Sequence, residues 1–545
     1  MLNKIKKILV FTLLLSVAFA ETYPASEYQR IMVVYTNDIH GGIPRTEATF
    51  MNPQFPPKIG SAPAIARIVK RVRKEAEEEG YGVLVIDEGD FFSGTPVGAR
   101  NAGQTVIEFM NIVGYDVLTV GNHDFDQSHT ELRKRAEQAN FALLGANVVN
   151  SESGEVLDFL KPYIIKEIHG IKVGILGIAT AVTPSMSFPE HVENMTFLPE
   201  ITTANKWIPI MKEEGADVII LSTHSWTPYE RDKAAAELHE KILRGEWPDK
   251  DKIGATGMEI AVSAPGIDAM FTGHVHKGFA EPYEDPINHT LVFQNYANGT
   301  NLGLVNFYIH KETKTLAGYD FEVDGTSYVT LLEDEFWIDE EMDSIIEHDR
   351  AIAEEGFDKV LTVLPAPLRR ANEGQSILGN LLCDAVAWGS NADVAFSNYG
   401  GLRSDLEAGP LTYESLFRFL PFGNSIVVFQ MTGAELHALI EDRVMGNSRG
   451  MLVSSGIEVV VDKRKANGER VTIKKLAGKD FDPKAIYKIA LSDYLAEGNS
   501  GYDRLTTIGI EHRMNTSYVM REALRDYLIE FGPKTQIDKR WTIIK

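Results

Sequence analysis

The chain has 545 residues, of which 44% are hydrophobic and 24% are charged, a composition typical of folded globular proteins. This length is too great for one hydrophobic core and predicts two or more domains. The formal net charge of −23 argues against a general nucleic-acid-binding protein, because neutralising a phosphate backbone needs a basic surface. A small anionic substrate is still compatible with this charge, since a local cluster of cations can outweigh a distant negative field.

The N-terminus carries the pattern of a secretory signal. Lysines precede an apolar stretch from Ile8 to Phe19, and Ala18-Phe19-Ala20 is a small-residue cleavage site. We interpret residues 1–20 as a signal peptide that is removed, because about a dozen apolar residues are too few to anchor the chain across a bilayer. The mature protein is therefore expected to be exported, with no stable membrane anchor.

Cys383 is the single cysteine, so the chain must fold without an internal disulfide. For an exported protein this favours a bacterial periplasm, cell surface or extracellular location over a eukaryotic ectodomain. Its neighbours, NLLCDAVAW, predict an amphipathic helix in which the thiol is buried and inert.

Between residues 28 and 327, strand-like runs alternate with helical patterns, which predicts an α/β layered domain. The segment SAPAIARIVKRVRKEAEEEG is one such helix, with Ser61 as its expected N-terminal cap and Gly80 as its end. Five of the strand-like runs end in side chains that bind metals. These runs are IMVVYTNDIH from Ile31, VLVIDEGD from Val83, VLTVGNHD from Val117, DVIILSTH from Asp217 and IDAMFTGHVH from Ile267. Because ligands of open α/β sheets bind beyond the carboxyl ends of the strands, we expect these side chains to converge.

The residues at the five strand ends form the mixed set of oxygen and imidazole ligands that two divalent metals bridged by a carboxylate need. We expect Asp38, His40 and His276 to hold one metal and Asn122, His224 and His274 to hold the other, with Asp90 bridging them. Each motif alone has an alternative: Asp90 could cap a helix, and a D-x-H or H-x-H pair is often a surface turn. Their shared position at strand ends favours a metal pair.

His123 and Asp126 lie beside Asn122 in the segment GNHDFD. If this segment turns helical, the carboxylate of Asp126 fixes the tautomer of His123 and leaves the other ring nitrogen facing a substrate. We interpret His123 as stabilising charge on a transferring phosphoryl group, the alternative being a structural role. Paired divalent metals lower the pKa of bound water toward about 7, so phosphoester hydrolysis is the predicted chemistry.

Residues 328–360 differ in sequence pattern from the segments before them. The segment EDEFWIDEEMDSIIEHDRAIAEEGFDK is acidic and periodic, which predicts a linker helix between domains. Residues 361–545 show a mixed α/β pattern of their own and are expected to form a second domain.

The metal motifs, D-x-H, G-D, G-N-H-D, H and G-H-x-H in this order, resemble those of the calcineurin-like metallophosphoesterases. The segments NYGGLRSDL from Asn398, LPFGNSIVV from Leu420 and SDYLAEGNSGYDRL from Ser492 resemble the substrate-binding domain of the 5′-nucleotidase family. The resemblance covers nearly the whole mature chain. It implies an N-terminal four-layer α/β/β/α metallophosphoesterase domain (28–327), joined by the linker helix to a smaller C-terminal α+β substrate-binding domain (361–545).

The resemblance also implies roles for single residues. The family's metal ligands fall on the seven residues already named, and its catalytic dyad falls on His123 and Asp126. His276 stands where relatives often carry an amide side chain. The implied cofactors are two divalent metal ions, which could be Zn, Mn, Co or Mg. The implied substrate-binding residues are Arg370, Asn398, Arg403, Phe422, Tyr494 and Ser500.

Within the substrate set, Phe422 and Tyr494 match the pair that stacks on the nucleobase, although each could instead be a packing residue. Asn398 and Arg403 match contacts to the base and to the phosphate or ribose.

Two departures bear on the substrate. Ser500 stands where relatives usually have an aspartate that holds the ribose. In the segment LRRANEGQSILGN, Arg370 or its neighbour Arg369 would contact the phosphate, and Ile377 replaces the usual asparagine.

The resemblance therefore implies an exported phosphohydrolase that removes the 5′-phosphate from nucleotides, by a metal-bridging hydroxide and the His123–Asp126 dyad. Its expected partner is a nucleotide or related small phosphoester, and not a nucleic-acid polymer. Because Ser500 replaces the usual aspartate, the alternative that the chain acts on 2′,3′-cyclic nucleotides, nucleotide sugars or a thiosulfate carrier stays open. A surface binding protein without turnover is a further alternative, against which the complete ligand set argues.

Overall fold

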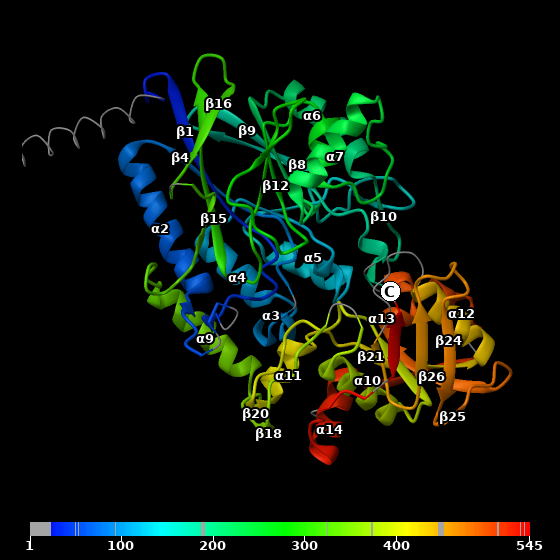
Figure 1. Ribbon diagram of the computed structural model, residues 1–545. Coiled ribbons are helices and arrows are strands. Elements are labelled where there is room, and N and C mark those ends of the chain that lie inside the picture. The colour runs from blue at the N-terminus through cyan, green and yellow to red at the C-terminus, as the bar shows by residue number, and fades with distance from the viewer. Residues whose placement is uncertain are drawn as a thin grey trace, which may run out of the picture. The chain divides into compact units, whose positions relative to one another are not determined.

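The structure is a computed structural model that describes residues 23–48, 51–52, 54–92, 94–185, 187, 191–323, 325–371, 374–444, 452–509, 512–534, 536–538 and 540–544 (Figure 1). The predicted signal peptide lies outside these residues. The chain divides into two units. The first comprises Met1–Phe92, Ala102–Thr183 and Glu193–Glu347, and the second Ser93–Asn101, Pro184–Val192 and His348–Lys545.

The first unit contains two large sheets. One has the strand order β16-β15-β1-β4-β5-β6, with β17 paired to β15. Its strands are β1 (Tyr28–Thr36), β4 (Gly82–Asp87), β5 (Val117–Thr119), β6 (Ala142–Leu144), β15 (Asn301–His310), β16 (Leu316–Phe321) and β17 (Tyr328–Thr330). Strands β1, β4, β5 and β6 are parallel, so their carboxyl ends lie at one edge of the sheet.

The other sheet has the order β13-β14-β12-β11-β9-β8. Its strands are β8 (Tyr163–Ile168), β9 (Ile171–Ile178), β11 (Val218–Thr223), β12 (Ala269–Thr272), β13 (Tyr283–Glu284) and β14 (Leu291–Gln294). Strands β9, β11, β12 and β14 are parallel. Two short pairs complete the strands of this unit, β2 (Thr46–Glu47) with β3 (Lys58–Ile59) and β7 (Val148–Asn150) with β10 (Met195–Phe197).

Successive side chains of a strand point to opposite faces of its sheet, and this alternation explains how the layers form. On β11, Val218 and Ile220 belong to a core shared with residues of the other sheet, such as Val33. Ile219 and Leu221 face the opposite way and belong to a core with helices α6 (Glu200–Glu213) and α8 (Gly257–Ser263). On the far side of the unit, α2 (Ser61–Glu79) contacts β4 and α4 (Gln104–Val113).

Figure 1 shows these outer helices on either side of the strands, with α2 on one side and α6 with α7 (Arg231–Leu243) on the other. The predicted four-layer α/β/β/α fold is therefore confirmed. Helix α5 (His129–Gln138) and the short helix η1 (His123–Phe125) complete the elements near the candidate site.

Helix α2 confirms one predicted boundary and corrects another. Gly80 ends the helix with a left-handed φ of 77° and donates its N–H to Ala76. The expected Ser61 cap is wrong, because Gly60 is the N-cap and, within the described structure, the Ser61 hydroxyl has no hydrogen-bond partner. The backbone of Ile43 instead accepts the N–H of Ala62 at 3.2 Å.

The segment predicted as a linker helix contains both a strand and a shorter helix. Tyr328, Val329 and Thr330 are aromatic or β-branched and form β17, which pairs with Asn301–Gly303 of β15. Helix α9 (Glu340–Ala353) follows, with the Asp339 carboxylate accepting the N–H of Met342 at its start. The boundary between the two units falls inside α9.

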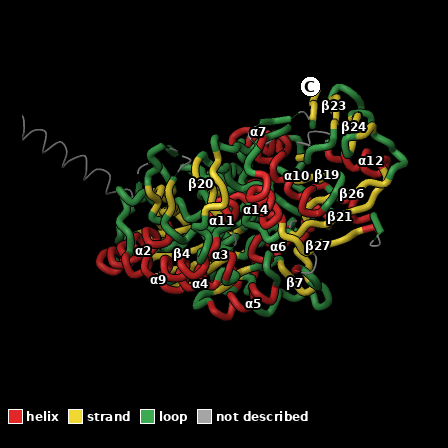
Figure 2. Tube along the Cα trace, turned by 90° about the horizontal axis from the view of Figure 1, so that it is seen from below, coloured by secondary structure: helices red, strands yellow, loops and turns green. Residues whose placement is uncertain are grey.

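The second unit is built on a mixed five-stranded sheet of order β22-β19-β26-β21-β27, of which Figure 2 shows β26, β21 and β27 side by side. A four-stranded sheet, β25-β24-β23-β28, and the pair β18-β20 complete its strands. The strands are β18 (Val360–Leu364), β19 (Val394–Ser397), β20 (Gly409–Thr412), β21 (Ser425–Thr432), β22 (Leu452–Val453), β23 (Glu458–Asp462), β24 (Val471–Leu476), β25 (Lys479–Asp480), β26 (Ile486–Ser492), β27 (Arg513–Val519) and β28 (Trp541–Ile544). The helices of this part are α3 (Pro96–Arg100), α10 (Ile377–Ser390), α11 (Tyr413–Phe419), α12 (Gly433–Arg443), α13 (Asp493–Ala496) and α14 (Met520–Phe531), with short turns η2 (Thr183–Ser185), η4 (Asn499–Gly501) and η5 (Asp503–Thr507).

The central sheet of the second unit has a hydrophobic core on each face. Along β21, Val427 and Phe429 belong to one core, and Ile426 and Val428 belong to the other. Cys383 is buried in α10 within the second of these cores, as the sequence predicts. None of the described helices has the length and apolar character that crossing a membrane requires.

Candidate metal centre

The seven predicted metal ligands lie in the segments that follow β1, β4, β5, β11 and β12. Asp38, Asp90 and His224 are almost completely buried, with 0%, 1% and 0% of their surface exposed. The other four are His40, Asn122, His274 and His276, of which the first two are buried and the last two partly buried. The carboxyl ends of the strands thus gather these side chains, as expected for an α/β layered fold.

Left-handed backbone is common among these residues. Five of them have positive φ: Asp38 (51°), His40 (48°), Asp90 (57°), His274 (74°) and His276 (57°). Non-glycine residues occupy this region only where the surrounding structure holds them there, and such residues cluster at functional sites.

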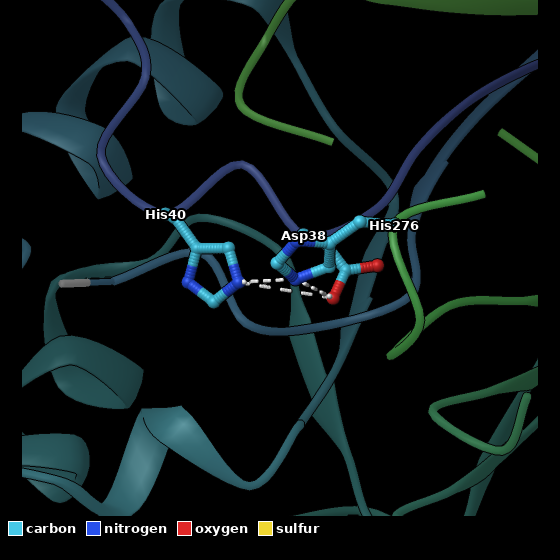
Figure 3. A group of neighbouring side chains, drawn as sticks. All are labelled: Asp38, His40 and His276. Atoms are coloured by element: carbon cyan, nitrogen blue, oxygen red, sulfur yellow. Dashed lines mark hydrogen bonds and ion pairs between the residues drawn. The ribbon is translucent and has the colours of Figure 1, made fainter. Parts of the chain in front are cut away.

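The first group of candidate ligands is Asp38, His40 and His276, whose side chains point toward one another in Figure 3. The Nε2 atoms of His40 and His276 lie 3.0 Å apart. Asp38 Oδ1 lies 3.4 Å from His276 Nε2 and 3.8 Å from His40 Nε2. These three ligand atoms lie within 4.8 Å of one another, so together they could hold a metal ion.

The second group is Asp90, His224 and His274. His224 Nε2 lies 3.0 Å from Asp90 Oδ2, and His274 Nδ1 lies 2.9 Å from Asn122 Oδ1. The same Asp90 oxygen is 3.8 Å from His40 Nε2, so Asp90 is near members of both groups. This is the position that a bridging carboxylate requires.

Two buried polar atoms at the centre bear on whether the residues present fit a metal ion. Among the described residues, Asp38 Oδ1 and His224 Nε2 are buried, and their close approaches to His276 and Asp90 lack the geometry of a hydrogen bond. A buried carboxylate oxygen without a partner is unfavourable unless a positive charge compensates it. Carboxylate, amide and imidazole ligands suit hard or borderline divalent cations, so the residues present fit a metal.

The charge balance of the centre leads to the same conclusion. Burial acts to raise the pKa of Asp38, but the imidazoles of His276 and His224 outweigh it and lower the pKa. Burial acts to lower the pKa of His224, but the carboxylates of Asp90 and Asp38 raise the pKa to about 10. Burial lowers the pKa of His274 to about 4. Asp38 therefore stays ionised and His274 stays neutral at neutral pH, which are the protonation states of these side chains that bind a cation.

Asp124 holds the loops that carry Asp90 and Asn122. Its Oδ2 accepts the N–H of Asp90 at 3.0 Å and that of Gly121 at 2.7 Å, and its Oδ1 accepts the N–H of Phe91 at 3.0 Å. Burial and the neighbouring Asp90 raise the pKa of Asp124 to about 7. Sequence reasoning missed this residue, whose one signal is an aspartate directly after the histidine in Gly-Asn-His-Asp.

Backbone and amide groups orient two further ligands. His224 Nδ1 lies 2.6 Å from the carbonyl oxygen of Glu88, so this nitrogen donates and Nε2 is left for a metal. Asn37 donates to Asp38 Oδ2 at 2.6 Å, which leaves Asp38 Oδ1 for the same purpose. These two contacts could not be predicted from the sequence, because Glu88 and Asn37 are not themselves candidate metal ligands.

The predicted dyad is brought together. His123 Nδ1 lies 2.8 Å from Asp126 Oδ2, and the short helix η1 supplies the turn that places the two side chains on one side. The backbone N–H of His123 also donates to Asp90 Oδ1 at 2.8 Å. His123 is therefore bound to its carboxylate partner through the imidazole and to the candidate bridging residue through its backbone.

In the second unit, the structure groups three of the predicted substrate residues. Asn398 Nδ2 donates to Ser500 Oγ at 3.4 Å, and Ser500 Oγ lies 3.5 Å from the Tyr494 hydroxyl. Ser500 is exposed and has a left-handed φ of 55°. The Arg403 guanidinium lies 5.7 Å from the ring centre of Phe422, so these two residues form a second pair.

Arg370 and Arg369, the predicted phosphate-binding arginines, form ion pairs with acidic side chains. Arg370 donates to Asp405 Oδ1 at 3.1 Å and to the Leu402 carbonyl at 3.0 Å. Arg369 pairs with Glu407. The sequence could not anticipate these ion pairs, because Asp405 and Glu407 lie more than thirty residues away along the chain. The role of either arginine in phosphate binding stays a prediction.

Comparisons with known proteins agree with the two-unit organisation. The family model described as calcineurin-like phosphoesterase matches residues 31–278. The family model described as 5′-nucleotidase, C-terminal domain, matches residues 358–507.

Individual relatives match over nearly their full lengths. The chain is 28% identical to a 5′-nucleotidase of Vibrio vulnificus, over 97% of this chain and 96% of that protein. It is 26% identical to Protein UshA of Yersinia enterocolitica, over 92% of this chain and 91% of the other. A solved structure of a 5′-nucleotidase precursor from Thermus thermophilus superposes with a TM-score of 0.77 at 22% identity, covering 94% of this chain and 99% of that one. At this identity, the structural likeness establishes the fold.

Proposed function

Because the chain belongs to the 5′-nucleotidase family of calcineurin-like phosphoesterases and is a phosphoester hydrolase, we propose that it removes the 5′-phosphate from nucleoside monophosphates. One observation carries this proposal. Two groups of side chains that could hold metal ions and the His123–Asp126 pair lie together at the strand ends of the first unit. The same chain carries a 5′-nucleotidase C-terminal domain.

The donor set fits two divalent cations. Asp38, His40 and His276 would hold one, and Asn122, His224 and His274 the other, with Asp90 between them. When bound, such ions supply Lewis acidity toward phosphoryl oxygens and activate water for attack on phosphorus. Zn, Mn, Co and Mg all match this mixture of carboxylate, amide and imidazole ligands.

His123 would stabilise the charge that develops on the phosphoryl group. Its Nδ1 lies 2.8 Å from Asp126 Oδ2, so the carboxylate holds the ring in one tautomer with Nε2 directed away from Asp126. The bond from its backbone N–H to Asp90 fixes the His123 backbone relative to the candidate bridging residue. A positioned imidazole of this kind contributes about 10²- to 10⁴-fold in rate.

The second unit would bind the nucleoside. The rings of Phe422 and Tyr494 offer stacking surfaces for a base, and such stacking tolerates the identity of the base. Ser500, with Asn398 and Tyr494 beside it, would face the ribose where relatives carry an aspartate. A hydroxyl there is a weaker partner for a ribose diol than a carboxylate, so we expect modest selectivity for the sugar.

We further propose that residues 1–20 direct export and are removed. Lysines followed by an apolar stretch and a small-residue cleavage site support this proposal. Nucleotide hydrolysis then takes place outside the cytoplasm.

The experiment is a phosphate-release screen with AMP, a 2′,3′-cyclic nucleotide and a nucleotide sugar, with Mn, Zn, Co and Mg supplied in turn. We expect the fastest release from AMP. In the same assay, His123→Ala should lower kcat by at least about 100-fold with little change in KM, because the imidazole acts on charge that develops during reaction. His239→Ala, an exposed histidine on α7, is the matched control and should retain wild-type rates.

Two results would contradict the proposal in different ways. Absence of phosphate release from AMP with all four metals would exclude the proposed substrate. An unchanged kcat in His123→Ala, with AMP hydrolysis intact, would exclude the proposed role of the dyad.

A further inference from the structure

The segment Ser225–Arg231, here the β11–α7 segment, follows His224 and packs along the loop that carries His274 and His276. That loop follows β12, and both of its histidines have left-handed backbone, with φ of 74° and 57°. Such a conformation persists only where neighbouring groups hold it. The contacts made by the β11–α7 segment are therefore candidates for what holds these two ligands in place.

Tyr229 makes the most direct of these contacts. Its hydroxyl donates to the carbonyl oxygen of Val275 at 2.6 Å. Val275 is the residue between the two histidine ligands, so this bond fixes the peptide that links them. The Tyr229 side chain is otherwise 64% exposed, so it contributes little to a hydrophobic core.

Trp226 contacts one of the ligands itself. Its ring centre lies 5.5 Å from that of His274, with the ring planes tilted by 42°. Gly254 stands behind the indole, since a Cβ built at Gly254 would lie 3.4 Å from Trp226 Cη2. The Trp226 carbonyl accepts the N–H of Gly257 at 2.9 Å, which fixes the backbone from which the indole reaches His274.

Two more bonds connect the same segment to this loop and its continuation. The Ser225 carbonyl accepts the N–H of Gly273 at 3.2 Å, and Gly273 directly precedes His274. Arg231 donates to the Glu281 carbonyl at 2.5 Å and lies 5.0 Å from the ring centre of Phe279. The β11–α7 segment therefore contacts the ligand loop before, within and after the pair of histidines.

We propose that Tyr229 and Trp226 are positioning residues that hold His274 and His276 in the geometry that binds divalent cations. Tyr229 acts on both ligands through the Val275 peptide, and Trp226 acts on His274 through ring packing. Together they set the affinity of the centre for its metals. This inference rests on the proposed function, because it takes these histidines to be metal ligands.

The test is a calorimetric titration of Mn²⁺ into the full chain after treatment with a chelator. Groups that orient metal ligands typically change metal affinity by about 10- to 100-fold when they are removed. We expect Tyr229→Phe to bind Mn²⁺ about tenfold more weakly than wild type, and Trp226→Ala to show a loss of at least that size. Trp226→Phe, which keeps an aromatic ring, should lie between Trp226→Ala and wild type.

Tyr81→Phe is the matched control in the same unit. The Tyr81 hydroxyl donates to the Val72 carbonyl at 3.2 Å, so the substitution removes the same kind of bond far from the ligand loop. We expect wild-type Mn²⁺ affinity for this variant. We also expect saturating Mn²⁺ to restore the AMP hydrolysis of Tyr229→Phe, because the lost bond acts through metal occupancy.

The proposal is wrong if Tyr229→Phe and Trp226→Ala bind Mn²⁺ as wild type does. It is equally wrong if Tyr81→Phe weakens binding by the same factor, because the effect would then be one of general stability. Failure of the proposed function would look different: wild type would bind Mn²⁺ but release no phosphate from AMP. In that case the titrations still test the positioning role.

Discussion

At the scale of single residues, Asp124 combines three hydrogen bonds on one buried carboxylate. It joins the backbone that carries Asp90 to the backbone before Asn122. A buried backbone N–H group that loses its acceptor is left without compensation, which costs free energy. Asp124 therefore supports the candidate metal centre without touching a metal.

Asp124→Asn should destabilise the protein by about 2–3 kcal/mol, because the new amide group turns a donor toward backbone N–H groups. Urea unfolding measures this loss. Asp158→Asn is the control, since Asp158 is an exposed aspartate paired with Arg133 and its loss should change stability by about 0.5 kcal/mol or less. A loss in Asp124→Asn no larger than in the control would contradict the assigned role.

Residue types explain why the candidate ligands could be proposed from the sequence while Asp124 could not. Asp38, His40 and their counterparts combine a metal-binding side chain with a position just after an apolar strand, and that combination is visible in a sequence. Asp124 is one more aspartate in a loop. Its role comes from backbone N–H groups, two of which lie more than thirty residues away along the chain, where a sequence does not show their position in space.

At the scale of elements, glycines let the ligand loops approach one another. A Cβ built on Gly121 would lie 2.2 Å from Asp90 Oδ1 and 2.6 Å from the Asp90 nitrogen. The segment that follows β5 can therefore pass beside Asp90 only if residue 121 has no side chain. The close approach brings Asn122 and His123 to Asp90, the candidate bridging residue.

Gly121→Ala should displace Asp90 and weaken Mn²⁺ binding by at least about tenfold. Calorimetric titration of the chelator-treated protein measures the effect. The control is Gly154→Ala in an exposed turn, where φ is 72° and a new Cβ would meet no atom within 4 Å. That variant should lose about 1 kcal/mol of stability through backbone strain and keep its metal affinity. Equal metal affinity in Gly121→Ala and wild type would refute the steric argument.

Elements with a strong hydrophobic periodicity could be predicted from the sequence. Short strands, and segments that combine a strand with a helix, could not. Helix α2 ends at Gly80 as predicted, because a long apolar stripe and a left-handed glycine both have sequence signals. The segment 328–360 was predicted as one helix, but its first residues pair with β15 as β17. Three residues are too few to show a period, so the partner strand decides their structure.

At the scale of the whole molecule, a buried ion pair anchors the C-terminal strand of the second unit. Arg540, 3% exposed, donates to Asp384 Oδ1 at 2.8 Å and to Oδ2 at 2.9 Å. Lys534 contacts the same carboxylate. Arg540 directly precedes β28, which pairs with β23, so the pair fastens this strand to helix α10. No sequence signal connects residues more than 150 positions apart in this way.

The stability of the second unit should depend on pH through Asp384. Burial acts to raise the pKa of Asp384, but Arg540 and Lys534 outweigh it and lower the pKa. Because the folded pKa lies below the unfolded value of about 3.9, the stabilisation is fully present above that pH. It is lost as the pH falls from about 4 toward the folded pKa.

Asp384→Asn should therefore destabilise the protein by about 3 kcal/mol at pH 7, because it removes the buried carboxylate from Arg540, whose other acidic partner, Asp538, is exposed. Urea unfolding between pH 7 and pH 3 should show the gap between variant and wild type closing below about pH 4. Asp503→Asn, at an exposed aspartate of the same unit, should follow wild type throughout. A gap that stays constant down to pH 3 would exclude titration of Asp384 as the cause.

The left-handed backbone at five candidate ligands also limits how this site can change during evolution. Aspartate, asparagine, histidine and glycine tolerate positive φ, whereas β-branched residues do not. A descendant that abandons catalysis can therefore replace Asp38 or His276 by asparagine or glycine and still fold. Replacement by valine, isoleucine or threonine would damage the fold as well as the chemistry. Catalytically inactive descendants should accordingly carry glycine or asparagine at these positions, and alignments of relatives would reveal that history.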